Sequence, residues 1–161
     1  MDLRLRLATP EDLEGIVELS LLAWAPVFRS FEAALGPAIF RLLYPEWPRQ
    51  QREVVERICT DSATFTVWVA EVDATVAGFI AYTLNMRDRT GEVELLAVHP
   101  AYQNRGVGAA LNNLALERMA ASGMTLAVVG TGGDPGHAAA RRSYEKAGYT
   151  ALPLVRYYKD L

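Results

Sequence analysis

Cysteine and histidine are scarce in this chain of 161 residues. The chain has one cysteine, Cys59, and two histidines, His99 and His137. A single thiol excludes an internal disulfide, and these three side chains are too few to build a zinc site. Without disulfides or metal ligands to indicate otherwise, we expect a cytoplasmic protein that binds no metal.

Long apolar runs and one-sided charge are also missing. Residues 1–6 alternate polar and apolar side chains, which is typical neither of a signal peptide nor of a membrane span. The net charge is −3 and the basic residues are scattered along the chain, so the sequence has no basic stripe to hold duplex nucleic acid. We therefore expect neither a membrane nor a nucleic acid as a partner.

The overall composition is that of an ordinary folded domain. Hydrophobic residues make up 51% of the chain and charged residues 22%, which excludes a disordered or fibrous protein. No internal repeat, low-complexity tract or linker interrupts the sequence. We predict a single domain over residues 1–161, long enough to bury a core.

Hydrophobic patterning predicts the elements of the N-terminal part. Alternating leucines favour a strand over residues 3–7. Thr9, Pro10 and Asp12 have the spacing of a helix cap, a first helical residue and a capping-box partner, so we expect a helix to begin here. Residues 24–47 are rich in aromatic side chains, but prolines and a glycine interrupt them, which predicts one or two short helices joined by turns.

The remaining elements follow from the same patterning. Strands and helices alternate after a predicted hairpin, so we expect a mixed sheet with helices on its faces, in the α/β (α+β) class. The expected helices are 48–60, 106–121 and 137–147, and the expected strands are 64–70, 76–84, 92–98, 124–129 and 150–159.

A strand, a short loop with two glycines and a helix follow one another over residues 95–111. The first turn of a helix has N–H groups without backbone partners, and the helix dipole places partial positive charge there. Gly106 and Gly108 let an anion approach the backbone, and Arg105 adds a charged donor. The alternative is a strand-to-helix turn that uses glycine only for tight packing, and two glycines alone favour that alternative.

The surrounding residues favour phosphate binding through a family resemblance. Gln-Asn-Arg-Gly-Val-Gly-Ala at 103–109 directly follows Leu-Ala-Val-His-Pro at 96–100. This pattern resembles the coenzyme A-binding signature of the GCN5-related N-acetyltransferases, the GNAT family. A second segment, 140–149, carries Tyr144 and ends in Gly-Tyr, and it resembles the family's second signature. Two signatures in the right order are more specific than either alone.

The resemblance covers nearly the whole chain and implies both a fold and a cofactor. The fold would be a twisted, mostly antiparallel sheet of about six to seven strands, with helices on both faces and a splayed central strand pair. Acetyl-CoA would lie in that gap as co-substrate, with no metal. The residues implied to contact it are Leu96, Ala97, Val98, Gln103, Asn104, Arg105, Gly106, Val107, Gly108, Ala109, His137, Ala140 and Tyr144.

Acyl transfer from a thioester needs a neutral amine, a donor for the oxyanion and sometimes a proton for the thiolate. The resemblance places the hydroxyl of Tyr144 near the cofactor sulfur as general acid. Glu94 is the candidate general base, although Glu92 has the same strand parity and could replace it. Both glutamates could instead be solvated or only attract a cationic substrate. The expected oxyanion donor is the backbone N–H of Val98 or Ala97.

Other positions leave alternatives open. His137 stands where the family often has asparagine, and it either contacts the cofactor, transfers a proton or is a partly exposed residue at a helix start. Trp24, Phe28 and Phe31 could line the site of the amine acceptor, a small molecule or peptide, together with Glu92. Alternatively, these aromatic residues belong to the core. The family also suggests a homodimer.

Two other functions compete with this enzyme. A non-catalytic module that senses acyl-CoA would share the same loop, but Tyr144 and Glu94 favour the enzyme. A dinucleotide-binding oxidoreductase fits poorly, because the loop lacks Gly-x-Gly-x-x-Gly and the acidic ribose ligand.

Overall fold

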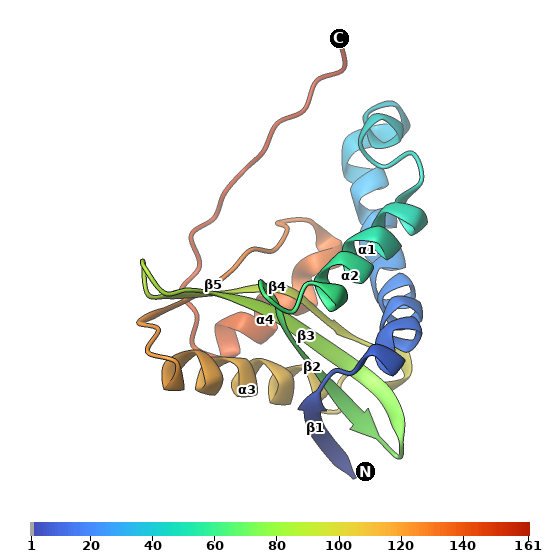
Figure 1. Ribbon diagram of the computed structural model, residues 1–161. Coiled ribbons are helices and arrows are strands. Elements are labelled where there is room, and N and C mark those ends of the chain that lie inside the picture. Colours follow the sequence, from blue (N-terminus) through green and yellow to red (C-terminus); the bar gives the residue numbers. More distant parts are fainter. Residues whose placement is uncertain (1) are drawn as a thin grey trace.

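The computed structural model describes residues 2–161, in which helices cover both faces of a five-stranded sheet (Figure 1). The strands lie in the order β1-β2-β3-β4-β5. The longer elements are β1 (Leu3–Leu7), α1 (Leu13–Leu43), α2 (Trp47–Thr60), β2 (Thr66–Val72), β3 (Thr75–Asn85), β4 (Thr90–Val98), α3 (Val107–Ala121), β5 (Leu126–Val129) and α4 (Ala138–Lys146).

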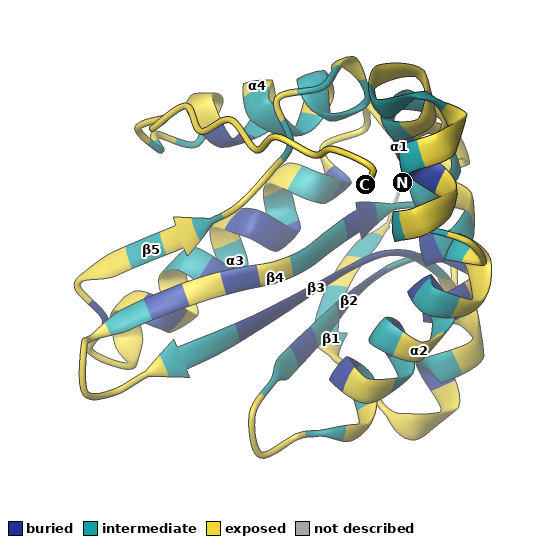
Figure 2. Cartoon of the chain, turned by 90° about the horizontal axis from the view of Figure 1, so that it is seen from above, coloured by how far each residue is buried: buried dark blue, intermediate teal, exposed yellow. Residues whose placement is uncertain are grey.

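The sheet is mixed, as the sequence predicts. The first three strand pairs are antiparallel, and β4 and β5 are parallel. The predicted hairpin is confirmed: β2 and β3 join through a two-residue turn at Asp73 and Ala74, both with positive φ, which suits the twist of a hairpin. Because β3 lies in the middle of the sheet, most of its length is buried (Figure 2).

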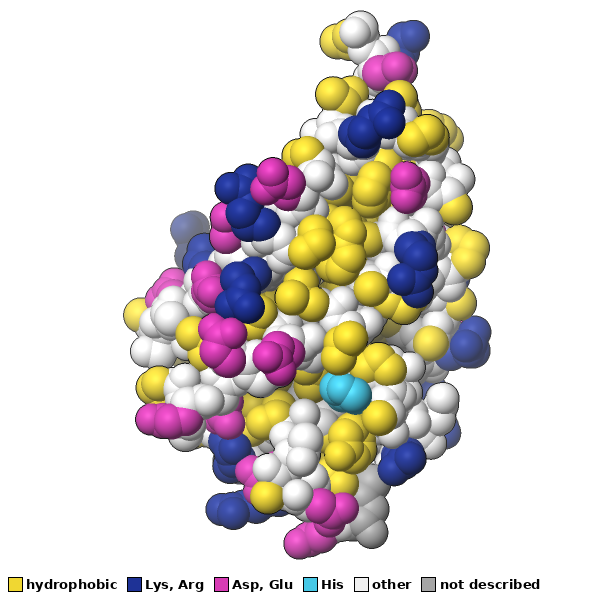
Figure 3. All heavy atoms as spheres, turned by 90° about the vertical axis from the view of Figure 1, so that its right-hand side faces the viewer, with side chains coloured by type: hydrophobic (Ala, Val, Ile, Leu, Met, Phe, Trp, Pro, Cys, Tyr) yellow, Lys and Arg dark blue, Asp and Glu magenta, His cyan; other side chains and the backbone are white. Residues whose placement is uncertain are grey.

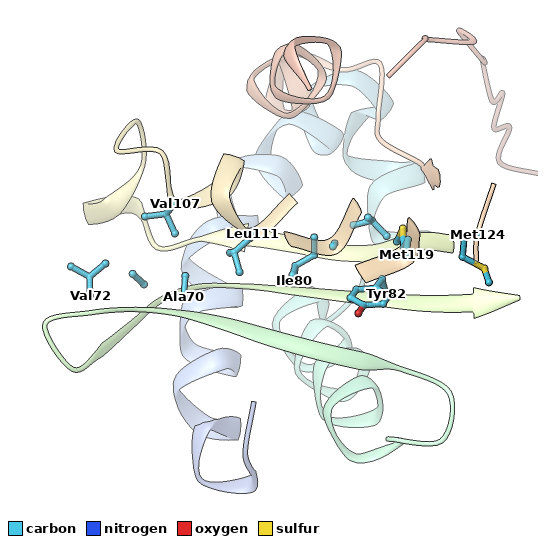
Figure 4. Close-up of a cluster of buried hydrophobic side chains, with 11 residues drawn as sticks. Ala70, Val72, Ile80, Tyr82, Val107, Leu111, Met119 and Met124 are labelled. Atoms are coloured by element: carbon cyan, nitrogen blue, oxygen red, sulfur yellow. The ribbon is translucent and has the colours of Figure 1, made fainter. Parts of the chain in front are cut away.

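Helix α3 covers one face of the sheet. Its buried residues Val107, Leu111 and Met119 pack against Ile80 and Tyr82 of β3, and Figure 4 shows these side chains between helix and strands. Their spacing along α3 is helical, which places them on one side of the helix. This packing fixes the start of α3 beside the end of β4.

Helices α1 and α2 cover the opposite face. Ile16 and Val17 of α1 and Val55 of α2 have no exposed surface and pack with Val69 and Phe79 of the sheet. A side chain without exposed area contributes about 1.5–3 kcal/mol through burial. Both helices are therefore held firmly on this face of the sheet.

Helix α1 corrects part of the prediction of one or two short helices over 24–47. It continues through Pro26 as a long helix, but Gly36, with a φ of +77° and a ψ of 160°, is not helical and divides the 31 residues into two helical segments. Pro37 comes directly after this kink, where a missing N–H costs little. The helix persists because its packing on the sheet outweighs the bond lost at Pro26. No helix within residues 2–161 has the length and apolar character needed to cross a membrane.

The predicted strand over 150–159 is wrong. Within residues 2–161 the sheet has five strands, fewer than the six to seven that the resemblance implied. The last residues have a β-type sequence but no partner strand in this chain, so no ladder forms. They run away from the body as an extended tail (Figure 1).

The predicted helix start at Thr9 is confirmed and belongs to a charged network. The Asp12 carboxylate accepts 2.7 and 2.9 Å hydrogen bonds from the Arg6 guanidinium and a 2.8 Å bond from the Thr9 N–H. Arg6 also donates to Glu71 of β2 at 3.0 Å. Asp12 is 8% exposed. The hydrogen bonds from Arg6 lower its pKa below the ordinary 3.8, and they outweigh the opposing effect of burial.

Asp12→Asn is expected to lower the free energy of unfolding at pH 7 by about 1.5–3 kcal/mol, because charge-assisted hydrogen bonds are lost. A carboxylate with a lowered pKa in the fold stabilises it above its unfolded pKa and loses this effect as the pH falls through the folded pKa. The difference between wild type and variant should therefore shrink below about pH 4. Urea unfolding at pH 7 and below about pH 4 measures this difference. The exposed Glu53→Gln is the control, and we expect its free energy of unfolding to lie within about 0.5 kcal/mol of the wild-type value.

Candidate active site

Strands β4 and β5 separate halfway along β4. They pair from Thr90 with Leu126 to Val93 with Val129, and β5 ends there. Residues 94–98 of β4 continue with only β3 beside them. The backbone N–H of His99 donates to the Ala77 carbonyl at 2.8 Å, and antiparallel bonds alternate along a strand. The N–H groups of Leu96 and Val98 therefore face away from β3, into the gap.

The loop after β4 ends at helix α3 with free backbone donors. Gly106 is the N-cap residue of α3 with a φ of +83°, and no described side chain caps this turn. The first N–H groups of the helix therefore have no hydrogen-bond acceptor from a side-chain cap, and the positive end of the helix dipole lies at the same place. Gln103 fixes the loop, because its side-chain amide donates to the Val98 carbonyl at 3.2 Å. This arrangement is suited to binding an anion.

A cleft of about 770 Å³ joins the strand gap to this loop. Its size lies in the range of ligand sites. The cleft brings together two regions that are distant in sequence. One is the end of β4 with the start of α3, and the other is helix α4. Of the residues predicted to contact a cofactor, all but Arg105 line it: Leu96, Ala97, Val98, Gln103, Asn104, Gly106, Val107, Gly108, Ala109, His137, Ala140 and Tyr144.

Tyr144 of α4 lies in the wall of this cleft and is 9% exposed. Its ring packs edge-on against Tyr149, with 5.6 Å between centroids. Burial, and secondarily the neighbouring Tyr149, raise the pKa of Tyr144 to about 12. The phenol therefore stays protonated throughout the neutral range and is available as a hydrogen-bond donor.

Glu94 lies at a bulge in β4. Ala81 of β3 pairs with Leu95 and the next residue pairs with Val93, so Glu94 has no residue opposite it. Bulges redirect side chains near functional sites. Glu94 lines the cleft, and the Thr83 hydroxyl lies 3.4 Å from its carboxylate. Both glutamates are exposed, but Glu92 does not line the cleft, so the lining of the cleft distinguishes two glutamates that strand parity could not.

His137 also lines the cleft, just before α4. Its Nδ1 pairs with the Asp134 carboxylate, and its ring centroid lies 5.5 Å from that of Phe31. Burial opposes ionisation of Asp134, but the hydrogen bonds of Ser30 and His137 lower its pKa below the ordinary value. The N–H of Gly136 donates to Ser30 at 3.0 Å. These contacts attach the glycine-rich loop to α1.

The family of the chain agrees with this geometry. The model of the family described as Acetyltransferase (GNAT) family matches residues 33–149. The chain belongs to the GNAT acetyltransferase family. The match includes β4, the loop at 103–109 and α4, which are the elements that form the cleft. The resemblance read from the two signatures is thereby confirmed.

Individual GNAT relatives agree with this assignment. Mycothiol acetyltransferase from Streptomyces griseus subsp. griseus is 32% identical over 92 residues, a match that spans 57% of this chain but only 29% of that relative. PaiA N-acetyltransferase from Thermoplasma acidophilum, in complex with coenzyme A, superposes with a TM-score of 0.75 at 19% identity, over 94% of this chain and 92% of that one. AAC(6')-Iy, bound to the bisubstrate analogue CoA-S-monomethyl-acetylneamine, gives a TM-score of 0.68 at 15% identity, over 100% and 99% of the two chains. The predicted fold class is confirmed by these likenesses.

The residues predicted for an acceptor site in this GNAT domain separate into two groups. Trp24 lines the cleft. Phe28 is 8% exposed and Phe31 packs beside it, and neither lines the cleft. Phe28 stacks on Trp47 at 4.5 Å between centroids, so this pair has the contacts of an aromatic core. On the side of α1, hydrophobic side chains gather along the middle of the surface with charged ones at the margins (Figure 3).

Two basic lining residues were missed from the sequence, Arg142 and Lys146 of α4, which bring positive charge to the cleft. Gly130 and Thr131 form its wall beyond β5. Arg142 and Lys146 are four residues apart and share a face of α4, but each lies two residues from Tyr144, so helical spacing around that tyrosine does not indicate them. Arg105 instead lies over the Tyr102 ring, 5.7 Å from its centroid.

Proposed function

We propose that this protein is an N-acetyltransferase that moves an acetyl group from acetyl-CoA to a primary amine by direct transfer in a ternary complex. One observation carries the proposal: a free strand edge and an uncapped helix start open into the same cleft. The first can pair with the amide groups of a pantetheine arm, and the second can bind a diphosphate. Few ligands combine a diphosphate with an arm that carries amide groups.

The chain's own residues fit this co-substrate. The N–H groups from about Asn104 to Ala109 hold the diphosphate, while Arg142 and Lys146 add positive charge along the cleft. The outward N–H and C=O groups of β4 pair with the pantetheine arm. When bound, acetyl-CoA supplies an activated thioester, and the protein has to position it, exclude water and stabilise charge.

Charge stabilisation falls to the backbone of β4. The oxyanion that forms on the acetyl carbonyl needs a donor placed in advance. The sequence offered the N–H of Val98 or of Ala97 as this donor. The alternation of hydrogen bonds along β4 favours Val98, because the N–H of Ala97 points towards β3. The N–H of Leu96 has the same orientation as that of Val98. These donors need no rearrangement during the reaction.

Tyr144 acts on the departing sulfur. Its pKa of about 12 lies well above the value of about 8.5 for an ordinary thiol. Complete proton transfer to a thiolate is therefore uphill by about 5 kcal/mol. Tyr144 accordingly donates a hydrogen bond to the sulfur as the bond to carbon breaks, and complete protonation of the thiolate is not required.

Glu94 takes a proton from the acceptor amine. Its carboxylate lines the cleft, and Trp24 offers an aromatic face in the same cleft. A carboxylate and an indole suit a cationic amine that must lose a proton before it attacks. The acceptor class is a small molecule or peptide with a primary amine; AAC(6')-Iy is named as an aminoglycoside enzyme, and another structural neighbour as a ribosomal-protein-alanine N-acetyltransferase.

Glu94→Gln is expected to lower kcat/KM on the order of 100-fold at neutral pH, because the amine loses its base. Glu92→Gln removes the same charge from the same strand outside the cleft, and we expect less than about a twofold change. Equal losses in both variants would mean that the glutamates only attract the substrate.

A thiol-release assay tests the proposed function. The purified protein is mixed with acetyl-CoA and a panel of aminoglycosides, polyamines, amino acids and peptides, and free coenzyme A is measured. We expect release with at least one amine and none without amines beyond slow hydrolysis. Tight acetyl-CoA binding without release across the panel would favour the acyl-CoA sensor instead.

A further inference from the structure

The cleft reaches the face of the sheet that α1 covers. Ala23, Trp24 and Val27 of α1 line it there, beside Ala97 of β4, which packs in the core cluster on this face. The helix start that suits a diphosphate lies on the opposite face, where Val107 of α3 packs against the sheet. A co-substrate held by that helix start therefore leaves the α1 end of the cleft to the acceptor amine.

The α1 end of the cleft has apolar and aromatic walls. Val27 is 9% exposed, and Trp24 packs against the same core cluster. The His137 ring also lines the cleft, and its Nδ1 is engaged by the Asp134 carboxylate. Walls of this kind bind alkyl chains and rings, because it is favourable to remove apolar surface from water. An ammonium in the same place would lose its hydration without gaining a partner.

One carboxylate is available to an amine in the cleft. Among the lining residues within 2–161, Glu94 is the only acid. Asp134 belongs to the loop before α4 and lies outside the lining, and its side chain is 10% exposed. The Asp134 carboxylate already accepts a 3.0 Å hydrogen bond from the Gly136 N–H and pairs with His137. Glu94 is therefore the single carboxylate that can pair with an ammonium here.

The other formally charged side chains around the cleft are basic. Within the described chain, Arg142 and Lys146 are the lysine and arginine residues that line it. A second cavity of about 590 Å³ shares Gly136 with the cleft, and its one charged lining residue is Arg29. An acceptor with several ammonium groups would place the additional charges against apolar walls or beside these cations, where like charges repel.

We propose that the acceptor is a compact monoamine with an alkyl or aryl body, rather than a polycation such as an aminoglycoside or a polyamine. This inference rests on the proposed function. Glu94 pairs with the single ammonium, and the body lies against Trp24 and Val27 at the α1 end of the cleft. A polycation needs several acidic partners, and the cleft offers one.

The same contacts serve the transfer. The ammonium passes one proton to Glu94, and its nitrogen lone pair then bonds to the acetyl carbon. As the carbon–sulfur bond breaks, its electron pair goes to sulfur, and the nitrogen loses a second proton that the thiolate recovers through solvent. The products are the N-acetylamine and the thiol of coenzyme A.

Hexylamine and hexamethylenediamine give a matched test, because they differ only by a second ammonium at the far end. We expect kcat/KM for hexylamine and for phenethylamine to exceed the values for hexamethylenediamine and spermidine by at least about 10-fold. Thiol release from acetyl-CoA measures all four amines. Equal or higher values for either polyamine would overturn the acceptor class while supporting the proposed function.

Calorimetric titration separates the acceptor class from the reaction. The same amines are titrated into the protein saturated with coenzyme A, and hexylamine should bind about 10-fold more tightly than hexamethylenediamine. If this preference holds but no amine releases thiol, the acceptor class is supported and the proposed function is wrong. Tighter binding of the diamine, or no binding of any amine, would overturn the acceptor class.

A second carboxylate at the α1 end should change the preference. Ala23→Asp is expected to raise the ratio of kcat/KM for hexamethylenediamine to that for hexylamine about 10-fold. Ala23→Asn has the same size without the charge, and Leu22→Asp places the charge on α1 at a residue that is 50% exposed and outside the lining. Both controls should keep the ratio within about twofold of wild type. An unchanged ratio in Ala23→Asp, shown to be folded by circular dichroism, would overturn the proposal.

Discussion

Tyr144→Phe is expected to lower kcat on the order of 100-fold while the dissociation constant of coenzyme A changes by less than about threefold. The substitution keeps the ring, its edge-on contact with Tyr149 and its place in the cleft. Only the hydrogen bond to the departing sulfur is lost. Because that bond forms as negative charge develops on sulfur, its loss affects the transition state more than the bound ground state. Steady-state kinetics and calorimetric titration with coenzyme A separate the two effects.

The neighbouring Tyr149 provides a matched control. It has the same hydroxyl, which donates to Asn112 and lies outside the lining of the cleft. Tyr149→Phe should lower stability by about 0.5–1.5 kcal/mol and leave kcat nearly unchanged. If both variants lose the same activity, the hydroxyl of Tyr144 has no special role. Equal losses in kcat and in coenzyme A affinity for Tyr144→Phe would place it in binding rather than catalysis.

The pH profile gives a further readout for Tyr144. With a pKa of about 12, this phenol keeps its proton over the whole range in which the protein is assayed. A decline in wild-type activity between about pH 8 and 10 cannot come from its ionisation, and the profile of Tyr144→Phe should have the same shape at a lower level. A basic decline that disappears in the variant would contradict the raised pKa.

Local patterns were sufficient to predict most of the fold. The β2–β3 hairpin, helix α3 and helix α4 follow from alternation, helical spacing and glycine stops, which act within a few residues. The continuity of α1 through Pro26 does not, because a proline inside a helix weakens it locally, whereas the burial of side chains such as Ile16 and Val17 against the sheet stabilises the helix. The prediction of a strand over 150–159 was wrong for a related reason. Its sequence favours a strand, but a strand also needs a neighbour.

The site shows the same division between local and distant information. Glycines at a helix start are compatible with an anion site, because both the conformation and the free donors are local properties, and the signature around them favoured that site over tight packing. The difference between Glu92 and Glu94 depends on where β5 ends and on a bulge opposite Ala81. The alternation of side chains along an ideal strand predicts neither the end of β5 nor the bulge. Arg142 and Lys146 line the cleft only because α4 lies across from α3, which a sequence pattern does not specify.

Gly106→Val is expected to weaken coenzyme A binding about 100-fold, equivalent to about 3 kcal/mol. Gly106 has a φ of +83°, a conformation that a β-branched residue adopts only under strain. When the backbone relaxes to relieve that strain, the N–H groups of the first turn of α3 turn away from the proposed diphosphate site. Two charge-assisted hydrogen bonds to the diphosphate would account for the loss. Calorimetric titration with coenzyme A measures it directly.

The other end of the same helix offers the control. Gly123 also has a φ of +83° and, like Gly106, open space where a β-carbon would lie, but it lies outside the lining of the cleft. Gly123→Val therefore introduces the same backbone strain, about 1–3 kcal/mol of destabilisation, without touching the anion site. Thermal unfolding should shift similarly in both variants, whereas only Gly106→Val should lose affinity. Equal losses of affinity would trace the effect to general destabilisation, and normal binding by Gly106→Val would place the diphosphate elsewhere.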